Sequence, residues 1–258
     1  MKNEKLLLLA LFSCVVILSF CALGVNSRRL INVVKEIKYS KNNILKARSA
    51  KNKITQSEVL SSAEPANGVD VGKKYVLPVK TQAQQKWFWC APTTVSMILA
   101  SRGVNISQSQ LASEMGTYEP FGTHNENAVR VLNRYLFGYE TPKSGQSGYR
   151  LEKITSSWGE ELGRFKERIV KNTKDGYPLY LTVDLAKLYP GRSNPAEHNI
   201  VGAGYISTPD DKDVALIYIV DPYSKFHNSV NGGLKIFKPE EVPEAAISSA
   251  VTEPHYAW

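Results

Sequence analysis

Of the 258 residues in the chain, 43% are hydrophobic and 22% are charged, which is the ordinary composition of a globular protein. The formal net charge of +8 comes from the N-terminal part, because residues 75–258 contain 19 basic and 19 acidic side chains. A nucleic-acid-binding domain carries its basic excess on the folded part, so this charge distribution excludes that class.

The N-terminal segment contains a long apolar run, because residues 6–25 are twenty positions without a charge. A run of this length is sufficient to span a bilayer, and it also fits a long secretory signal sequence. We therefore expect residues 1–27 to be a signal sequence or membrane anchor and the protein to be extracytoplasmic, either secreted or membrane-anchored. If the segment is not cleaved, the basic residues that follow it, Arg28 and Arg29 among them, favour a cytoplasmic location for the C-terminal side. A buried core helix is the remaining alternative.

A basic segment follows, in which residues 28–74 contain eleven Lys and Arg against four acids. We interpret it as a basic linker or pro-segment, and a surface-lying amphipathic helix next to a membrane fits its beginning equally well. The folded domain is then expected to occupy residues 75–258.

The first half of this domain is predicted to be mainly helical. A short strand is expected at residues 75–79, and a helix begins at Cys90 and ends at Arg102, with Gly103 placed to cap it. Capping-box spacing predicts further helices that open at Ser107 and at Ser157, the second ending near Gly176. Apolar spacing predicts a helix over residues 125–137, and the Gly-, Pro- and Ser-containing segment 138–156 is expected to be an irregular loop.

The second half is predicted to be β-structure, with strands at residues 178–185, 198–206, 213–221 and 234–237. Helices followed by antiparallel strands indicate an α+β fold. If the strands 198–206 and 213–221 pair with their ends aligned, His198 lies directly opposite Asp221.

Cysteine usage singles out one thiol. Cys14 and Cys21 lie in the apolar run, so Cys90 is alone in the rest of the chain and no disulfide within the domain explains it. At a helix start, unpaired backbone N–H groups and the helix dipole help to stabilise a thiolate, the form in which cysteine is a nucleophile. A small buried hydrophobic residue is the alternative interpretation of a single cysteine.

A thiol nucleophile needs a base that takes its proton and returns it to the leaving group. Three of the four histidines are expected to be solvated surface residues: His124, His227 and His255. His198 differs, because an acid opposite an imidazole holds the tautomer and the orientation of the ring. We therefore predict Cys90 as nucleophile, His198 as general base and Asp221 as orienting acid.

The oxyanion formed by attack on a carbonyl needs hydrogen-bond donors. The backbone N–H of Cys90 is one candidate, and the side chain of Gln84 is another. Gln82 and Gln85 are close by in sequence, so the residues alone leave the choice among the three glutamines open. Trp87 and Trp89 are candidate substrate-binding residues in the wall of a cleft, with ordinary packing as the alternative.

Three segments resemble the motifs of papain-like cysteine peptidases: QQKWFWCAPTTVSMIL at 84–99, HNIVGAGY at 198–205 and IVDPY at 219–223. Within that group they resemble the branch typified by the double-glycine leader peptidases, peptidase family C thirty-nine. The resemblance implies a papain-like fold in which an N-terminal helical half carries the nucleophile and a C-terminal antiparallel sheet carries His and Asp. It also implies the roles given to Cys90, His198 and Asp221, and it places Gln84 in the oxyanion hole. Ala91 departs from the family, whose members commonly have Gly between the Cys and the Pro.

These patterns together predict a cysteine peptidase that is exported or membrane-tethered and hydrolyses peptide bonds through an acyl-thioester. Two alternatives remain: another thiol acyl-transfer enzyme, such as an amidase or a transglutaminase-like enzyme, and a catalytically silent peptide-binding module. The expected partner is a peptide or protein substrate, with no nucleic acid, and the membrane is contacted through residues 6–25 if they are not cleaved. No metal-ligand cluster or phosphate-binding loop is evident in the sequence, so no cofactor is predicted.

Overall fold

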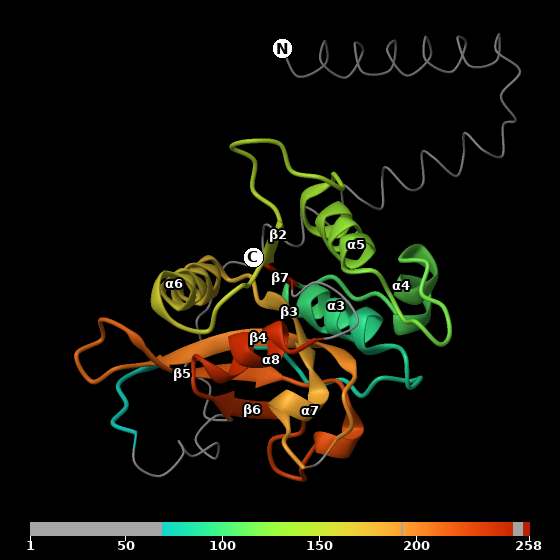
Figure 1. Cartoon of the computed structure of the whole chain (residues 1–258). Helices are drawn as coiled ribbons and strands as arrows, with labels where there is room; N and C mark the ends of the chain where they lie inside the picture. Colours follow the sequence, from blue (N-terminus) through green and yellow to red (C-terminus); the bar gives the residue numbers. More distant parts are fainter. Residues whose placement is uncertain (1–68, 192, 250–254) are drawn as a thin grey trace, which may run out of the picture. The chain divides into compact units, whose positions relative to one another are not determined.

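The computed structural model describes residues 69–258 except residue 192 and residues 250–254 (Figure 1). The predicted signal sequence or anchor at 1–27 lies outside these residues, as does most of the basic segment at 28–74. Within the described part of the chain, no helix is long and apolar enough to cross a membrane.

Four helices of the first half follow the predicted pattern: α3 (Cys90–Ser101), α4 (Gln108–Glu114), α5 (Asn125–Phe137) and α6 (Gly159–Asp175). Gly103 follows α3 with a φ of +78°, a left-handed conformation that suits glycine after a helix. Ser107 caps α4 as expected, because its hydroxyl accepts the backbone N–H of Gln110 at 3.2 Å. The predicted cap of α6 is wrong: Trp158 takes the N-cap position without a side-chain hydrogen bond, and Ser157 lies outside the helix.

The described residues form a seven-stranded antiparallel sheet made of β1 (Lys74–Val76), β2 (Leu151–Lys153), β3 (Leu179–Asp184), β4 (Glu197–Ser207), β5 (Val214–Val220), β6 (Leu234–Phe237) and β7 (His255–Ala257). The strand order is β2-β7-β3-β4-β5-β6, and β1 pairs with β4. Strand β2 lies in the segment expected to be a loop, and β7 was not predicted at all. Because β7 lies between β2 and β3, the last residues of the chain form an interior strand.

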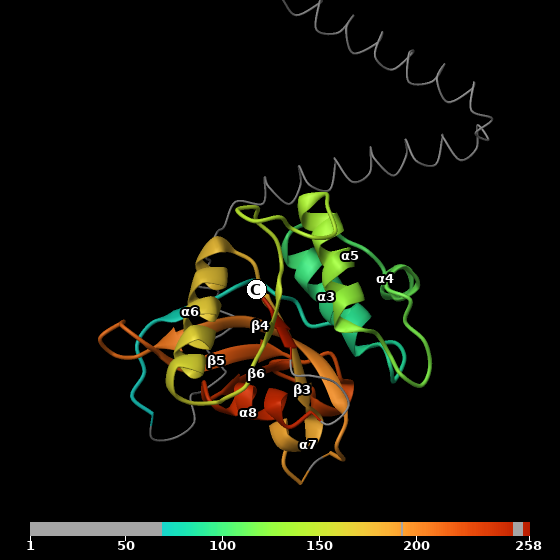
Figure 2. The same ribbon diagram turned by 45° about the horizontal axis from the view of Figure 1, so that its top comes forward.

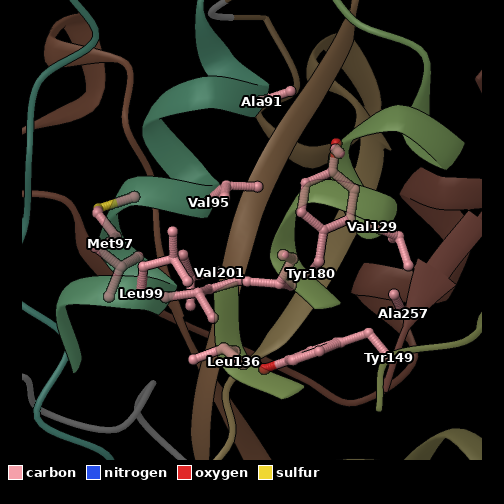
Figure 3. Packing of buried hydrophobic residues seen from close by; sticks show 14 of the residues in the cluster. Ala91, Val95, Met97, Leu99, Val129, Leu136, Tyr149, Tyr180, Val201 and Ala257 are labelled. Atoms are coloured by element: carbon pink, nitrogen blue, oxygen red, sulfur yellow. The ribbon is translucent and has the colours of Figure 1, made fainter. Parts of the chain in front are cut away.

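The sheet carries a hydrophobic cluster on each face. On one face α3 packs against β4, and α5 packs against α3, in a cluster that includes Val95, Leu132 and Val201. Figure 3 shows Val95 and Leu99 of α3 close to Val201. On the other face, Phe165 of α6 packs with Ile200, and α8 (Glu241–Ile247) joins the same cluster. Figure 2 shows α3 and α5 side by side, apart from α6. Helices followed by an antiparallel sheet confirm the predicted α+β fold class.

The predicted register between β4 and β5 is wrong by two residues near the candidate site. The hairpin closes with Ser207 opposite Val214, and the pairing reaches Val201 opposite Val220. The turn is therefore centred one residue later than expected. A bulge between Gly202 and Gly204 further changes which residues face each cluster.

The bulge is tied to the first strand of the domain. Gly204 has a φ of +151°, and a Cβ there would lie 2.1 Å from the carbonyl oxygen of Tyr75 in β1. Glycine therefore allows β1 to pair with β4 beyond the bulge.

Candidate active site

Cys90 is the first residue of α3, and Trp89 is the N-cap residue. The Trp89 carbonyl accepts the N–H of Thr93 at 3.1 Å, which begins the hydrogen-bond ladder of the helix. Cys90 is a free cysteine and is half-buried. Its sulfur therefore lies at the positive end of the helix dipole.

His198 and Asp221 form a buried pair. Nε2 of His198 lies 2.8 Å from Oδ1 of Asp221, and the two residues are 3% and 0% exposed. His198 comes from β4, and Asp221 follows the last residue of β5. Continuing the observed register would set Asp221 opposite Ile200 rather than His198. Because the offset is two residues, both side chains stay on the same face of the sheet and still meet.

The electrostatics of the pair favour a charged imidazole beside a charged carboxylate. Burial alone lowers the pKa of His198, but the Asp221 carboxylate, its hydrogen bond and the neighbouring Cys90 raise that pKa from 6.5 to about 10. Burial raises the pKa of Asp221, but His198, the Tyr189 hydroxyl and the Tyr223 N–H more than offset it, so that this pKa lies below 3.8. With Nε2 directed at Asp221, the Nδ1 atom of His198 is left for the thiol proton.

Asp221 is held by further groups that sequence reasoning missed. The Tyr189 hydroxyl donates to its Oδ2 at 2.7 Å, while the Tyr189 ring stacks on Phe226 with centroids 4.0 Å apart. His227 donates from Nε2 to the carbonyl oxygen of Asp221 at 2.8 Å. His227 is half-buried, so its expected role as a solvated surface residue is wrong. His227 is covered because of a contact between distant residues: the Asp221 N–H donates to the Gly233 carbonyl at 2.9 Å, which folds the intervening loop onto the site.

Asn199 contacts the thiol from the other face of the sheet. Cys90 Sγ donates to Asn199 Oδ1 at 3.3 Å, and the Thr94 hydroxyl of α3 donates to the Asn199 carbonyl at 2.9 Å. Neighbouring residues on a strand point to opposite faces, so Asn199 faces α3 while His198 faces Asp221. The role of Asn199 was not predicted, although a polar residue within the apolar run of β4 was a sequence signal that could have indicated it.

The loop before α3 carries the candidate oxyanion donor. The Gln84 N–H donates to the carbonyl of Pro222 at 2.9 Å, which ties this loop to the residue that follows Asp221. The Gln84 Nε2 donates to the carbonyls of Lys86 at 3.1 Å and Trp87 at 2.7 Å, within the same loop. Its Oε1 is buried without a hydrogen-bond partner among the described residues.

The neighbouring glutamines have other contacts. Gln82 Oε1 accepts the Ser96 hydroxyl at 3.1 Å, and the Gln85 N–H donates to the side-chain oxygen of Gln108 at 3.0 Å. Gln82 is thus bound to α3 away from its start. Of the three glutamines, Gln84 has its backbone bound next to Asp221.

The two candidate substrate-binding tryptophans have different surroundings. Trp87 is 63% exposed, and its indole Nε1 donates to Glu119 at 3.2 Å. Trp89 is buried, and the Lys86 ammonium lies 4.8 Å from the centre of its ring. Trp87 therefore has surface free for a ligand, whereas Trp89 mainly packs.

A cavity of about 1130 Å³ is lined by Phe137, Tyr149 and Trp258 among others, and its lining includes none of Cys90, His198 and Asp221. Among residues 69–258, leaving out the gaps at 192 and 250–254, no group of three His, Cys, Asp or Glu side chains is arranged to hold a metal ion.

Comparison with solved structures finds distant similarity. A double-glycine motif protease from an AMS/PCAT transporter, in complex with the leader peptide, is 12% identical over 73% of this chain and 95% of its own, with a TM-score of 0.42. The peptidase domain of Streptococcus ComA, a bifunctional ABC transporter involved in quorum sensing, is 13% identical over 70% and 96%, with a TM-score of 0.42. A C39-like peptidase from Bacillus anthracis is 16% identical over 72% and 96%, with a TM-score of 0.47.

A comparison with curated proteins found no match. The model of the Peptidase_C39 like family matches residues 76–241, which is more than half of the chain. This match covers the segments in which the resemblance was recognised, from before Cys90 to beyond Asp221, and it confirms that resemblance. The chain belongs to the Peptidase_C39 like family.

Proposed function

We propose that this chain is a cysteine peptidase that hydrolyses a peptide bond through an acyl-thioester on Cys90. The observation that supports this most directly is the buried His198–Asp221 pair, joined at 2.8 Å, with Cys90 contributing to the raised pKa of His198. Membership of the Peptidase_C39 like family gives independent support.

In the proposed reaction, Nδ1 of His198 already carries the proton taken from Cys90, as the raised pKa of His198 favours, and the sulfur attacks the carbonyl carbon of the scissile bond. Asp221 remains a carboxylate and stabilises the imidazolium, consistent with its lowered pKa. His198 then gives its proton to the departing amine, which leaves the acyl group on sulfur. A water molecule, deprotonated by His198, cleaves the thioester and frees the thiol.

The oxyanion is proposed to bind the backbone N–H of Cys90 and the amide of Gln84. Both Gln84 Nε2 contacts are carbonyls of its own loop, at 3.1 and 2.7 Å. The donor therefore has to release one of these bonds when the oxyanion forms. The contact between Gln84 and the oxyanion would then exist only in the transition state, so it would stabilise that state more than the ground state, as catalysis requires.

We further propose that the protein works outside the cytoplasm, secreted or anchored by residues 6–25, with residues 75–258 as the peptidase domain. The apolar run of twenty uncharged positions supports this placement. Intact mass of the protein from fractionated cells tests it. A full-length protein in the soluble cytoplasmic fraction would contradict it.

The peptidase proposal is tested with the full chain, a peptide library and mass spectrometry of the products. We expect cleavage with transfer to water, together with a covalent acyl adduct on Cys90 in the wild type. Cys90→Ala should abolish both while the protein keeps its thermal unfolding midpoint. Cleavage that survives in Cys90→Ala, or peptide binding without turnover in the wild type, would refute the proposal.

A further inference from the structure

The indole of Trp87 lies beside the side chain of Glu119, close to the start of α3. Trp87 is 63% exposed, and its Nε1 donates to Glu119 Oε1 at 3.2 Å. Glu119 belongs to a short hairpin in which Tyr118 and Gly122 exchange backbone hydrogen bonds of 3.0 and 2.7 Å. A Cβ at Gly122 would lie 3.5 Å from the carbonyl oxygen of Phe88, so the hairpin lies next to the loop that precedes the nucleophile.

The carboxylate of Glu119 has no basic partner in the described part of the chain. Glu119 is exposed, and no lysine or arginine that the structure describes forms an ion pair with it. Its Oε1 accepts from Trp87, and a carboxylate has further acceptor positions on both oxygens. Lys86 is close in sequence, but its ammonium is over the rings of Phe88 and Trp89, at 5.8 and 4.8 Å from their centres.

An exposed indole face beside an unpaired carboxylate is a combination that recognises a cation. The ring attracts an ammonium or guanidinium group placed over its face, and Trp does so more strongly than Tyr or Phe. The carboxylate of Glu119 accepts the N–H groups of the same cation. Lys86 shows that the rings of this loop take an ammonium group. A large apolar side chain also covers an indole, but it offers Glu119 no opposite charge.

We propose that Trp87 and Glu119 form a specificity subsite for a lysine or arginine side chain of the peptide substrate. This inference rests on the proposed function of Cys90 as the nucleophile. Trp87 precedes Cys90 by three residues, and three residues of extended chain span at most about 11 Å. A bound substrate strand rises about 3.3 Å per residue. The basic residue is therefore expected within about four residues of the scissile bond.

The two side chains can be removed separately without disturbing the loop. Glu119→Gln keeps an amide oxygen that accepts from Trp87 Nε1 but removes the negative charge. Trp87→Leu removes the ring but leaves the backbone carbonyl of residue 87, to which Gln84 donates. Because both side chains are exposed, the two variants should keep the thermal unfolding midpoint of the unchanged protein.

The test is the binding of peptide arrays to the full-length protein with Cys90→Ala, which cannot form the acyl-thioester. Each spot carries peptides with one fixed residue (lysine, arginine, norleucine, alanine or glutamate) among randomised uncharged positions. Norleucine has an aliphatic chain like that of lysine but no ammonium group. We expect lysine and arginine spots to bind about three- to thirtyfold more tightly than norleucine spots, the sum of an exposed cation–π contact and an exposed ion pair.

Both Glu119→Gln and Trp87→Leu, each added to Cys90→Ala, should reduce this preference for lysine over norleucine. Glu119→Lys should reverse it in favour of glutamate. The basic residues 28–74 attract acidic peptides in every variant alike, so the change in preference between variants is the quantity to compare. A residue that only supports the loop would weaken the binding of all spots by the same factor.

Matched controls come from α6. Trp158, its N-cap residue, is 76% exposed, and Glu167 is an exposed acid of the same helix. Trp158→Leu and Glu167→Gln make the same chemical changes and should leave the preference for lysine unchanged.

The proposal is overturned if norleucine spots bind as tightly as lysine spots, which would make the subsite apolar, or if no spot is bound. It is equally overturned if Glu119→Gln keeps the full preference or if the α6 variants reproduce its loss. Array binding needs no turnover, so the two proposals fail separately. A preference for lysine in a chain whose wild type cleaves no peptide would sustain the subsite and refute the peptidase. Cleavage without a basic residue near the cut bond would refute the subsite alone.

Discussion

The two sides of the candidate site differ in how completely their polar atoms are bonded. On the sheet side, formed by His198, Asn199 and Asp221, each residue is at most 3% exposed and has hydrogen-bond partners of its own. On the loop side, formed by residues 84–89, Trp87 is 63% exposed and Gln84 Oε1 has no partner among the described residues.

This difference assigns a separate task to each side. The groups that move the proton are held rigidly by packing and hydrogen bonds before any substrate arrives. The groups proposed to meet the substrate are on a loop whose bonds are largely its own, and ligand-binding segments are commonly drawn from such less constrained regions. Substitutions on the sheet side should therefore affect both stability and turnover, whereas those on the loop side should affect turnover alone.

On the sheet side, replacing the general base His198 should have the largest effect on turnover and stability. His198→Ala removes the proton acceptor and leaves the fully buried Asp221 carboxylate without its charged partner. We expect turnover to fall by about 10²- to 10⁴-fold and the free energy of unfolding to fall by about 3–5 kcal/mol. Peptide cleavage and urea unfolding measure the two losses.

His124→Ala is the matched control, because His124 is exposed and contacts Phe121 rather than the site. It should stay close to wild type in both measurements. If His198→Ala loses turnover but unfolds like wild type, the sheet side is less constrained than its contacts indicate.

Breaking the loop side should separate turnover from stability. Gln84→Ala removes the proposed oxyanion donor, which should lower kcat by about 100- to 1000-fold, or about 2.7–4 kcal/mol, with little change in KM. The unfolding midpoint should not change, because the lost hydrogen bonds are to carbonyls of the same loop.

Gln85→Ala should be close to wild type, whereas Gln82→Ala should lose stability through its bond to Ser96 and keep its turnover. A large loss of kcat in Gln82→Ala or Gln85→Ala, with Gln84→Ala active, would mean that another residue donates to the oxyanion.

A smaller loss of stability and turnover is expected at Tyr189, which supports Asp221 on the sheet side. Tyr189→Phe deletes the hydroxyl that donates to Asp221 Oδ2 at 2.7 Å but keeps the ring that stacks on Phe226. A hydrogen bond to a charged group is worth about 1.5–3 kcal/mol, so unfolding free energy should fall by that amount. Turnover should fall about tenfold as Asp221 holds His198 less firmly, since each 1.4 kcal/mol is about a factor of ten.

Tyr118→Phe is a control for the chemical change, because Tyr118 is 50% exposed. Equal losses in the two Tyr→Phe variants would show that the Asp221 contact is not responsible.

The smallest expected effect is the change in the free energy of unfolding with each unit of pH. The pKa of His198 is raised from 6.5 to about 10 on folding, so its contribution to stability is fully present below pH 6.5 and is lost as pH rises toward 10. The pKa of Asp221 is lowered, so its contribution is present above its unfolded value and is lost only as pH falls through the folded value. One titrating group changes the free energy of unfolding by at most about 1.4 kcal/mol per pH unit.

The measurement is urea unfolding at intervals from pH 6.5 to 10, with His198→Ala as the reference. The wild type should lose its advantage over the variant across this range. An advantage that stays constant would mean that His198 is not charged in the folded protein at neutral pH.

Local sequence determined the elements that carry the chemistry. The bounds of α5 agree with the apolar spacing of residues 125–137, and α3 begins at Cys90 as predicted. The strand runs around His198 and before Asp221 were likewise found where β-branched and aromatic residues gather. Helix spacing, caps and strand runs depend on neighbours within a few residues, so the printed sequence contains the necessary information.

Contacts between distant segments were decided only by the tertiary structure. Asn199 reaches Cys90, Tyr189 reaches Asp221, and His227 folds back onto the Asp221 carbonyl. The register of β4 and β5 depended on where the hairpin turned and on the bulge at Gly202–Gly204. Strand β7 gains its hydrogen bonds from β2 and β3, so its three residues, His255–Ala257, gave no local signal. In each case the stabilising partner lies far away along the chain, and which partner is chosen depends on the packing of the whole domain.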